Sequence, residues 1–381
     1  MFIPRMIQES IRKRFFRGKA IVLYGPRQSG KTTLIHALLN REKESALFMN
    51  GDEPDVRALL GQMTSTRLRS MLGNRRFLVI DEAQRIPNIG LTAKLAADQL
   101  RGIQVIITGS SSLDLADKTS EPLTGRKYEF TLLPFACCEL AEKNGWLDER
   151  RLLPTRLVYG AYPDIVVHAA DAETLLRALA GSYLYKDLLM LEQIKKPTLL
   201  EKIVRALAFQ CGSEVSFLEL GQLVGADPKT VEKYVDLLEK AYVIFTLPAF
   251  SRNMRNEIKK SRKIFFYDCG IRNAVLGNFL PIESRTDVGV LWENYAQAER
   301  RKLLVMKGAA ARGYFWRTTD QKEIDYIEET ENGLAAYEFK WQDKGKARLP
   351  KKFIAAYPGA ELHVITPENS DIFLTPSSVG A

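Results

Sequence analysis

The sequence has few cysteines and no long apolar segment. Its four cysteines, Cys137, Cys138, Cys211 and Cys269, show neither zinc-ligand nor C-x-x-C spacing, and a disulfide between the adjacent Cys137 and Cys138 would be strained. We therefore expect four reduced thiols. No run of about 18 apolar residues occurs, and the first residues lack the apolar stretch and cleavage site of a secretory signal. These absences predict a soluble, cytoplasmic protein without a membrane partner.

Length and charge indicate the number of domains and the kind of partner. A chain of 381 residues exceeds one ordinary domain and predicts about two or three, and a hydrophobic content of 46% is ample for packed cores. The formal net charge of +9 favours a polyanionic partner such as DNA, although a merely basic soluble surface is the alternative. Residues 1–19 combine basic and apolar side chains in a pattern that predicts a packed amphipathic helix.

A phosphate-binding loop follows the first predicted strand. Residues 25–32 fit the pattern G-x-x-x-x-G-K-[ST], with an apolar strand over 20–24 before them and helical spacing of apolar residues over 32–40 after them. The glycines allow backbone N–H groups to face phosphates, Lys31 is expected to reach the β- and γ-phosphates, and the Thr32 hydroxyl is expected to bind Mg²⁺. The expected nucleotide-binding residues are Gly25, Pro26, Arg27, Gln28, Ser29, Gly30, Lys31, Thr32 and Thr33.

Two carboxylates end a later strand. After a second strand over 46–49, the apolar residues 77–80 lead to Asp81 and Glu82. This pair suits a Mg²⁺ ligand next to a residue that positions the attacking water, because phosphoryl transfer needs both. A further strand over 104–108 leads to Ser110, which we expect to sense the γ-phosphate beside the strand that carries Asp81. An ordinary helix N-cap is the alternative role for Ser110.

These motifs resemble those of an AAA+ ATPase. The segments GPRQSGKTT, IDEAQ, TGSS and LTGR, together with LPF, are similar to a prokaryotic family of AAA+ ATPases joined to a C-terminal domain of unknown function. The resemblance implies an ATPase domain with a parallel sheet over residues 1–140, followed by a helical linker or lid over 141–198, with ATP and Mg²⁺ as cofactors.

The same resemblance gives Arg126 a role. In such ATPases an arginine completes the γ-phosphate site, and Arg126 lies where the family's motif has one. We expect Arg126 to act on a nucleotide bound by a neighbouring subunit, which requires a homo-oligomer. A surface arginine that merely ends a turn is the alternative.

The middle of the chain predicts three helices followed by two strands. Helical or strand-like spacing occurs over 200–209, 218–224, 230–241, 242–247 and 263–267. Asp227 can cap the third helix, with Pro228 in its first position. This order predicts a winged helix-turn-helix domain over residues 199–286.

Basic residues gather in this predicted domain. They suit phosphate contacts that carry affinity without sequence preference, and the alternative is a winged helix that docks protein beside a solvated basic loop. The predicted DNA-binding residues are Lys229, Thr230, Lys233, Arg252, Arg255, Lys259, Lys260, Arg262 and Lys263.

The C-terminal residues 287–381 predict an α/β domain that resembles restriction endonucleases. The predicted elements are a helix over 291–304 and strands over 313–317, 323–328 and 335–341. Glu338 and Lys340 are two positions apart on a strand, so both point to one face, and Asp325 and Glu293 complete the set used by Mg²⁺-dependent nucleases of the PD-(D/E)xK type. The family resemblance continues through the segments KIFFYDCG, WEN and EFK. A chance alternation on a solvated strand is the alternative.

The leading hypothesis is an AAA+ protein that hydrolyses ATP, binds DNA through a winged helix, and carries a nuclease-like C-terminal domain. Two alternatives belong to other classes. One is a Mg²⁺-dependent DNA nuclease gated by ATP, and the other is a nucleotide-dependent signalling or scaffold switch that does not process DNA.

Overall fold

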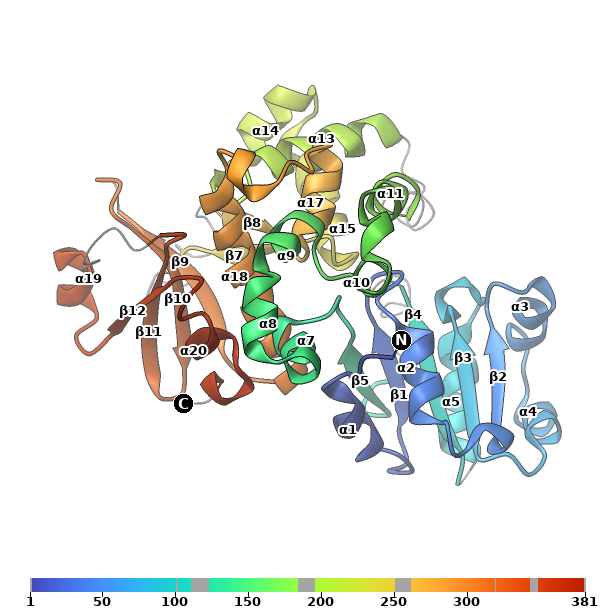
Figure 1. Ribbon diagram of the computed structural model, residues 1–381. Coiled ribbons are helices and arrows are strands. Elements are labelled where there is room, and N and C mark those ends of the chain that lie inside the picture. The colour runs from blue at the N-terminus through green and yellow to red at the C-terminus, as the bar shows by residue number, and fades with distance from the viewer. Residues whose placement is uncertain are drawn as a thin grey trace. The chain divides into compact units, whose positions relative to one another are not determined.

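The chain forms two compact units. The computed structural model describes residues 2–100, 102–110, 123–183, 196–250, 262–318, 320–342 and 349–379. The N-terminal unit comprises residues 2–134 with 240–242, and the C-terminal unit comprises the described residues of 135–239 and 243–381 (Figure 1). The predicted boundary at residue 140 lies close to this division, whereas the other two predicted boundaries fall inside the C-terminal unit. Among the described helices, none combines the length and the apolar character needed to cross a membrane.

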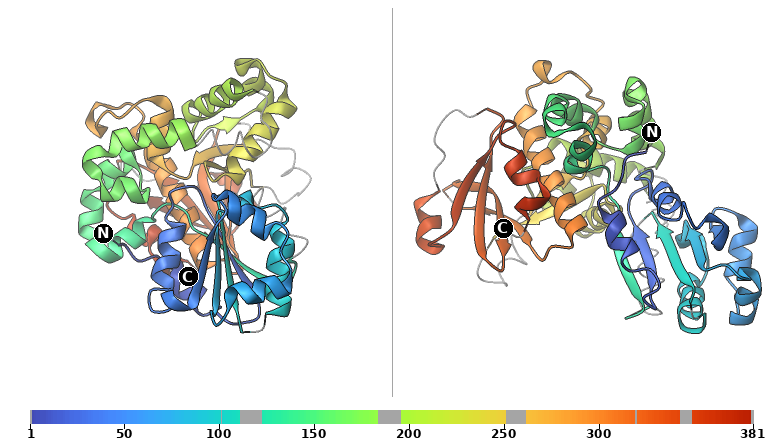
Figure 2. Two further views of the ribbon diagram at one scale, coloured as in Figure 1. Left: turned by 90° about the vertical axis from the view of Figure 1, so that its right-hand side faces the viewer. Right: turned by 60° about the horizontal axis from the view of Figure 1, so that its bottom comes forward.

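A five-stranded parallel sheet is the core of the N-terminal unit. Its strands are β1 (Ala20–Tyr24), β2 (Ala46–Asn50), β3 (Phe77–Asp81), β4 (Gln104–Gly109) and β5 (Lys127–Thr131). Their order is β2-β3-β4-β1-β5, and all neighbours pair in parallel. Helices cover both faces of the sheet (Figure 2), so β1 and β4 are buried along their whole length, and β1 reads as a continuous apolar run. The four strands that the sequence predicted in this unit are confirmed.

One short helix precedes these strands and others connect them. They are α1 (Ile7–Arg12), α2 (Lys31–Leu38), α3 (Pro54–Leu60), α4 (Ser65–Leu72) and α5 (Ile89–Gln99), with the 3₁₀ turns η1 (Lys43–Ser45) and η2 (Ala83–Arg85). The amphipathic helix predicted over residues 1–19 is shorter than expected. It ends at Arg12 because the following residues turn back, with Phe16 at φ 58°, and the rings of Phe15 and Phe16 pack edge-on against Phe77.

Helices begin the C-terminal unit. They are α7 (Cys137–Asn144), α8 (Trp146–Arg151), α9 (Leu153–Tyr159), α10 (Pro163–Val167) and α11 (Ala172–Ala178), followed by the π-helical turn η4 (Leu179–Tyr183). The next elements are α13 (Pro197–Phe209), β6 (Glu214–Val215), α14 (Phe217–Val224), α15 (Pro228–Lys240), β7 (Ile244–Pro248) and β8 (Arg262–Phe266). The three strands form an antiparallel sheet in the order β6-β8-β7.

The predicted order of three helices and two strands is therefore confirmed, and β6 is an addition. Asp227 caps α15 as expected, because its Oδ1 accepts a hydrogen bond from the Thr230 amide over 2.9 Å. Pro228 occupies the first position of this helix, where its missing N–H group removes no helical hydrogen bond.

A long helix and a mixed sheet complete the chain. The elements are α17 (Cys269–Leu276), α18 (Val288–Lys307), β9 (Arg312–Arg317), β10 (Glu323–Thr330), β11 (Gly333–Phe339), α19 (Lys351–Ala356), β12 (Glu361–Ile365) and α20 (Asp371–Leu374). The sheet order is β12-β11-β10-β9, with β11 and β12 parallel and the other pairs antiparallel. Phe353 of α19 is fully buried against Ile324, Ile327 and Ala336 of this sheet. The predicted helix and the three predicted strands are confirmed.

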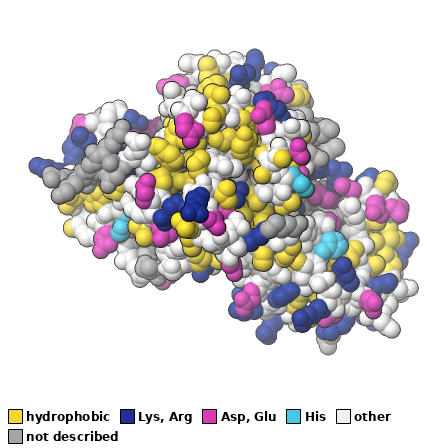
Figure 3. Space-filling model, in the orientation of Figure 1, with side chains coloured by type: hydrophobic (Ala, Val, Ile, Leu, Met, Phe, Trp, Pro, Cys, Tyr) yellow, Lys and Arg dark blue, Asp and Glu magenta, His cyan; other side chains and the backbone are white. Residues whose placement is uncertain are grey.

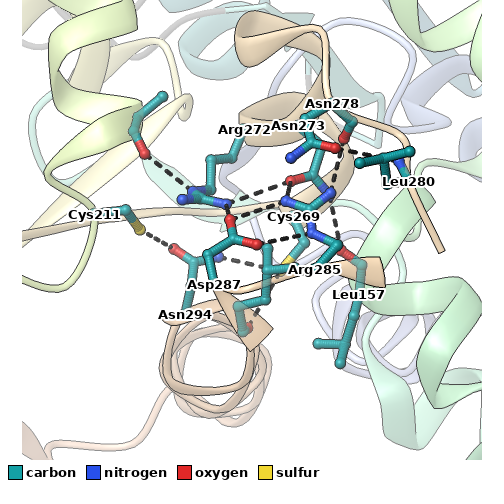
Figure 4. Close-up of polar contacts among 12 residues, drawn as sticks. Leu157, Cys211, Cys269, Arg272, Asn273, Asn278, Leu280, Arg285, Asp287 and Asn294 are labelled. Carbon is teal, nitrogen blue, oxygen red and sulfur yellow. Dashed lines mark hydrogen bonds and ion pairs between the residues drawn. The ribbon is translucent and has the colours of Figure 1, made fainter. Parts of the chain in front are cut away.

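Buried polar contacts join several helices of the C-terminal unit (Figure 4). Asp287, which precedes α18, accepts from the Arg272 guanidinium at 2.7 Å and from Arg285 Nε at 2.9 Å. The Asn273 amide donates to the Leu157 and Val158 carbonyls at the end of α9. These side chains pair with one another inside the protein, so we assign them to the architecture.

Candidate active site

Two glycines shape the phosphate-binding loop between β1 and α2. Gly25 has φ +151°, and a Cβ added there would lie 2.1 Å from the Leu132 carbonyl oxygen, so no larger residue fits without moving the chain. Gly30 adopts φ +91° as the residue before α2, a conformation that glycine accepts without steric cost. The loop therefore leads directly to the amide groups at the start of α2, which attract anions. Of the other predicted loop residues, Pro26 and Ser29 are buried, Arg27 is half-buried, and Gln28, Thr32 and Thr33 are exposed.

Lys31 lies folded over this loop. Its ammonium donates hydrogen bonds to the carbonyl oxygens of Gly25 and Pro26, each over 2.9 Å, and the residue is only 5% exposed. The carbonyl oxygens of Gly25 and Pro26 therefore keep the positive charge of Lys31 close to the loop backbone, next to the amide groups at the start of α2.

Asp81, at the end of β3, joins two threonines. Its Oδ2 accepts a hydrogen bond from the Thr32 hydroxyl over 2.7 Å, and its Oδ1 accepts one from the Thr108 hydroxyl of β4. The structure therefore brings together the hydroxyl and the carboxylate that the sequence assigned to Mg²⁺. Carboxylate and hydroxyl oxygens are the hard ligands that Mg²⁺ prefers, so this donor set fits the ion. Thr108 was not identified as a site residue from the sequence, because there it is only one position of a predicted buried strand.

Glu82 reaches Ser110 through a third side chain. Glu82 has a left-handed backbone with φ 48°, and its amide donates to Thr108 Oγ1 over 3.1 Å. The amide nitrogen of Gln84 lies 2.6 Å from Glu82 Oε2 and 3.0 Å from Ser110 Oγ, which places the buried Gln84 between the two predicted residues. Gln84 was also missed, although it lies only two positions after Glu82 in the chain.

Arg5 supports the loop from a distant part of the sequence. Its guanidinium donates to the Ser29 carbonyl over 2.9 Å and to the Leu133 carbonyl over 2.6 Å, and the residue is buried. The sequence assigned Arg5 only to a basic helix. No local pattern could identify this role, because it depends on carbonyl groups 24 and 128 residues away.

Arg126 lies at the opposite end of the sheet from the phosphate-binding loop. It immediately precedes β5, whose first residue pairs with Ala20, the first residue of β1, whereas the loop follows the last residue of β1. A five-residue strand separates the two ends by about 16 Å. The Arg126 guanidinium forms an exposed ion pair with Asp98 at 2.6 Å. Arg126 therefore does not contribute to the nucleotide site of its own subunit.

A second set of charged residues lies on the C-terminal sheet. Lys340 follows β11, and its ammonium lies 2.7 Å from Glu338 Oε2 and 3.8 Å from Asp325 Oδ2, so these three predicted residues do share one face. Glu293 of α18 also lies near Asp325, whose negative charge raises the pKa of Glu293. With Glu323 of β10, these side chains form what we name the carboxylate cluster: Glu293, Glu323, Asp325 and Glu338.

Lys263 enters this cluster from β8. Its ammonium lies 3.0 Å from Glu293 Oε1 and also pairs with Glu323. Burial raises the pKa of Glu293, Lys263 opposes the rise, and Asp325 adds to it, with the pKa at about 7. Among the described residues, no group of three or more His, Cys, Asp or Glu side chains is arranged to hold a metal ion. Ammonium groups lie beside all three predicted metal ligands, Glu293, Asp325 and Glu338.

The predicted DNA-binding residues occupy different environments. Lys229 and Lys233 are exposed on α15, and the Thr230 hydroxyl bonds to Asp227. The Arg262 guanidinium lies over the Phe217 ring at 4.6 Å. Lys263 is 3% exposed, so its assignment to a DNA-binding surface was wrong: its neighbours in sequence are basic, but acidic groups from α18 and β10 surround it. Arg252, Arg255, Lys259 and Lys260 lie outside the described residues.

Cationic side chains do not gather in one place on the face drawn in Figure 3, where dark-blue and magenta groups are interspersed. All four cysteines are buried free thiols, as the sequence predicted. Burial raises the pKa of Cys137 and of Cys211 to about 12, which leaves neither thiol reactive near neutral pH.

Three family descriptions match successive parts of the chain. Residues 17–141 match "AAA domain", residues 150–281 match "Domain of unknown function (DUF8612)", and residues 288–378 match "Domain of unknown function (DUF4143)". An uncharacterised protein of Mycobacterium tuberculosis is 27% identical over 84% of this chain and 69% of its own length. An uncharacterised protein of Haemophilus influenzae is 25% identical over 80% of this chain and 78% of its own.

A solved structure has a similar fold. It is the Walker-type ATPase of Pyrococcus abyssi, with a TM-score of 0.52 and 15% identity, and the similarity covers 72% of this chain and 96% of that one. At this identity the likeness concerns the fold alone. The match of residues 17–141 and the shared fold support a prokaryotic AAA-type ATPase with a P-loop.

Proposed function

We propose that the protein binds ATP with Mg²⁺ through its N-terminal unit and hydrolyses it. The observation that carries the proposal is the contact of Asp81 with both Thr32 and Thr108, with Glu82 next in the chain. Bound Mg²⁺ would neutralise charge that develops on the phosphates. Thr32 and Asp81 would hold the ion, Lys31 would face the phosphates, and Glu82 would orient the attacking water.

Two substitutions test this assignment. Lys31→Ala should abolish nucleotide binding, whereas Glu82→Gln should retain binding and lose turnover, because only the residue that orients water changes. Binding of a fluorescent ATP analogue and release of phosphate measure the two effects. Lys43→Ala, at an exposed lysine of η1, is the matched control. Equal turnover in the wild type and Glu82→Gln would remove Glu82 from its role.

A second candidate function is DNA binding by a winged helix-turn-helix. The supporting observation is the order α13, β6, α14, α15, β7, β8, in which the capped helix α15 carries the exposed Lys229 and Lys233. Lysines on such a helix suit phosphate contacts, which give affinity that falls with salt. The rival is a winged helix that docks protein.

Charge reversal separates these two roles. Lys229→Glu with Lys233→Glu should weaken binding to unrelated duplexes alike and reduce the slope of log affinity against log salt by about 2, since each lost phosphate contact contributes about 0.9. Fluorescence anisotropy at several salt concentrations gives the slope. Lys202→Glu, at an exposed lysine of α13, is the control. Unchanged affinity in the double variant would favour the docking role.

For the C-terminal sheet we propose a nuclease-like fold without metal-dependent cleavage. The order α18, β9, β10, β11, α19, β12 and the mixed sheet support the fold. The Lys263 ammonium, which is not part of the predicted nuclease set, pairs with Glu293 and Glu323 and argues against cleavage. Incubation of a plasmid with the protein, ATP and Mg²⁺ should give no nicked or linear product, and cleavage that Lys340→Ala eliminates would contradict the proposal.

A further inference from the structure

The carboxylate cluster concentrates negative charge in a small, mostly buried region. Its members come from three elements, and their side chains are 17–28% exposed. Four carboxylates at this density repel one another and disfavour ionisation unless positive charge is supplied. Burial raises the pKa of Glu338, and the nearby Asp325 raises it further. Cations beside the cluster would offset this repulsion.

Lys263 supplies one such cation from a strand of a different sheet. It belongs to β8, which pairs with β6 and β7 rather than with the C-terminal sheet. Its side chain is 3% exposed, and its ammonium pairs with Glu293 and Glu323 and lies 5.7 Å from the centre of the Phe315 ring. A buried ammonium is costly unless carboxylates compensate it. Burial would lower the pKa of Lys263, but Glu293 and Glu323 outweigh this effect and raise it, so the charge is retained.

Lys340 supplies the second cation. Its ammonium pairs with Glu338 at 2.7 Å and lies 3.8 Å from Asp325. Each carboxylate of the cluster thus has an ammonium partner, and the two lysines together bring the same charge as one divalent cation. Arg317 adds a longer contact of 3.7 Å to Glu323 and a 3.2 Å contact to Glu214 of β6.

We infer that Lys263 is the resident cation of the carboxylate cluster: its ammonium takes the place of a divalent metal ion and holds β8 to α18 and β10. The residue then serves as a positioning group that excludes metal and joins two sheets. The inference concerns neither ATP hydrolysis nor DNA binding, and its test uses neither ligand, so its failure leaves those proposals intact.

Removal of Lys263 should convert the cluster into a metal site. The parent for the experiment is the full chain with Asp81→Asn, which removes metal binding at the P-loop. The probe is Mn²⁺ alone, and its binding is measured by electron paramagnetic resonance and by the shift in melting temperature. Lys263→Met should bind Mn²⁺ about tenfold or more tightly than the parent, because no ammonium competes for the carboxylates. Lys263→Met with Glu293→Gln should lose this gain. Lys322→Met, at an exposed lysine, is the control.

The parent and a second variant keep the inference testable if Lys263→Met does not fold. The parent and its Glu293→Gln variant should show the same weak Mn²⁺ binding, and Lys263→Arg, which keeps the charge, should behave like the parent. Mn²⁺ binding by the parent that Glu293→Gln removes would overturn the inference. A Lys263→Met variant that melts at the parent's temperature and gains no Mn²⁺ site would overturn it too.

Discussion

Gln84 donates a hydrogen bond to Glu82 Oε2 over 2.6 Å. The same amide nitrogen lies 3.0 Å from Ser110 Oγ, so one buried side chain fixes both predicted catalytic groups. We expect Gln84→Ala to lower kcat about tenfold with little change in nucleotide affinity, because Glu82 loses the donor that orients its carboxylate. Steady-state ATPase rates and equilibrium nucleotide binding measure the two quantities. Gln99→Ala, at an exposed position of α5, should change neither, and an equal loss of affinity and turnover in Gln84→Ala would contradict the role.

Thr108 should set the concentration of Mg²⁺ that the ATPase needs. Its hydroxyl donates to Asp81 Oδ1, and groups that orient a metal ligand typically change metal affinity by about 10- to 100-fold. Thr108→Val keeps the side-chain shape and should raise the Mg²⁺ concentration for half-maximal activity about tenfold. Thr92→Val is the matched control, since that buried hydroxyl bonds to the Leu60 carbonyl instead. A similar Mg²⁺ requirement in both variants would show that Asp81 needs no support from β4.

Arg126 should act only between subunits. It lies at the end of the sheet opposite its own phosphate-binding loop, so any contact with a nucleotide requires a neighbouring chain. Arg126→Ala and Lys31→Ala should each be inactive alone. An equal mixture should regain about a quarter of wild-type activity, because about a quarter of the interfaces in a symmetric oligomer then pair an unaltered Lys31 with an unaltered Arg126. No recovery, together with a wild type that stays monomeric with ATP, would exclude action between subunits.

Asp287 should make stability depend on acid pH. Burial alone would raise its pKa, but hydrogen bonds and charge from Arg285 and Arg272 lower the pKa from 3.8 to about 2. Its contribution to stability is therefore fully present above pH 3.8 and is lost as the pH falls toward 2. Asp287→Asn should destabilise the protein by about 3 kcal/mol at neutral pH, because two buried guanidiniums lose the negative charge that compensates them.

Urea denaturation from pH 7 to pH 2 measures this effect. The difference in the free energy of unfolding between the wild type and Asp287→Asn should shrink below pH 3.8. Asp148→Asn removes an exposed ion pair with Arg151 and serves as the control. A constant difference across the acid range would mean that the lowered pKa does not contribute.

The parts of this fold that the sequence predicted are those with local causes. Glycines at Gly25 and Gly30 and an apolar run before them identify the phosphate-binding loop without any distant contact. Thr108 could not be assigned, because it meets Asp81 only when β4 lies beside β3 in the folded sheet. Arg5 could not be assigned either, because the chain start reaches the Ser29 carbonyl of the loop only in the folded protein. Lys263 was misassigned for the same reason: its sequence neighbours are basic, whereas its spatial neighbours are the acidic Glu293 and Glu323.

The contacts of α18 with the start of α7 have a consequence for biosynthesis. The Cys137 amide donates to Glu299 Oε2 over 2.5 Å, and the buried Lys302 ammonium donates to the Phe135 carbonyl. The partners are 162 residues apart for the first bond, so the ribosome needs about 8 to 32 s between making them. During this interval the Cys137 amide and the Phe135 carbonyl lack their partners on α18. The start of α7 can therefore complete its buried hydrogen bonds only after α18 has been synthesised.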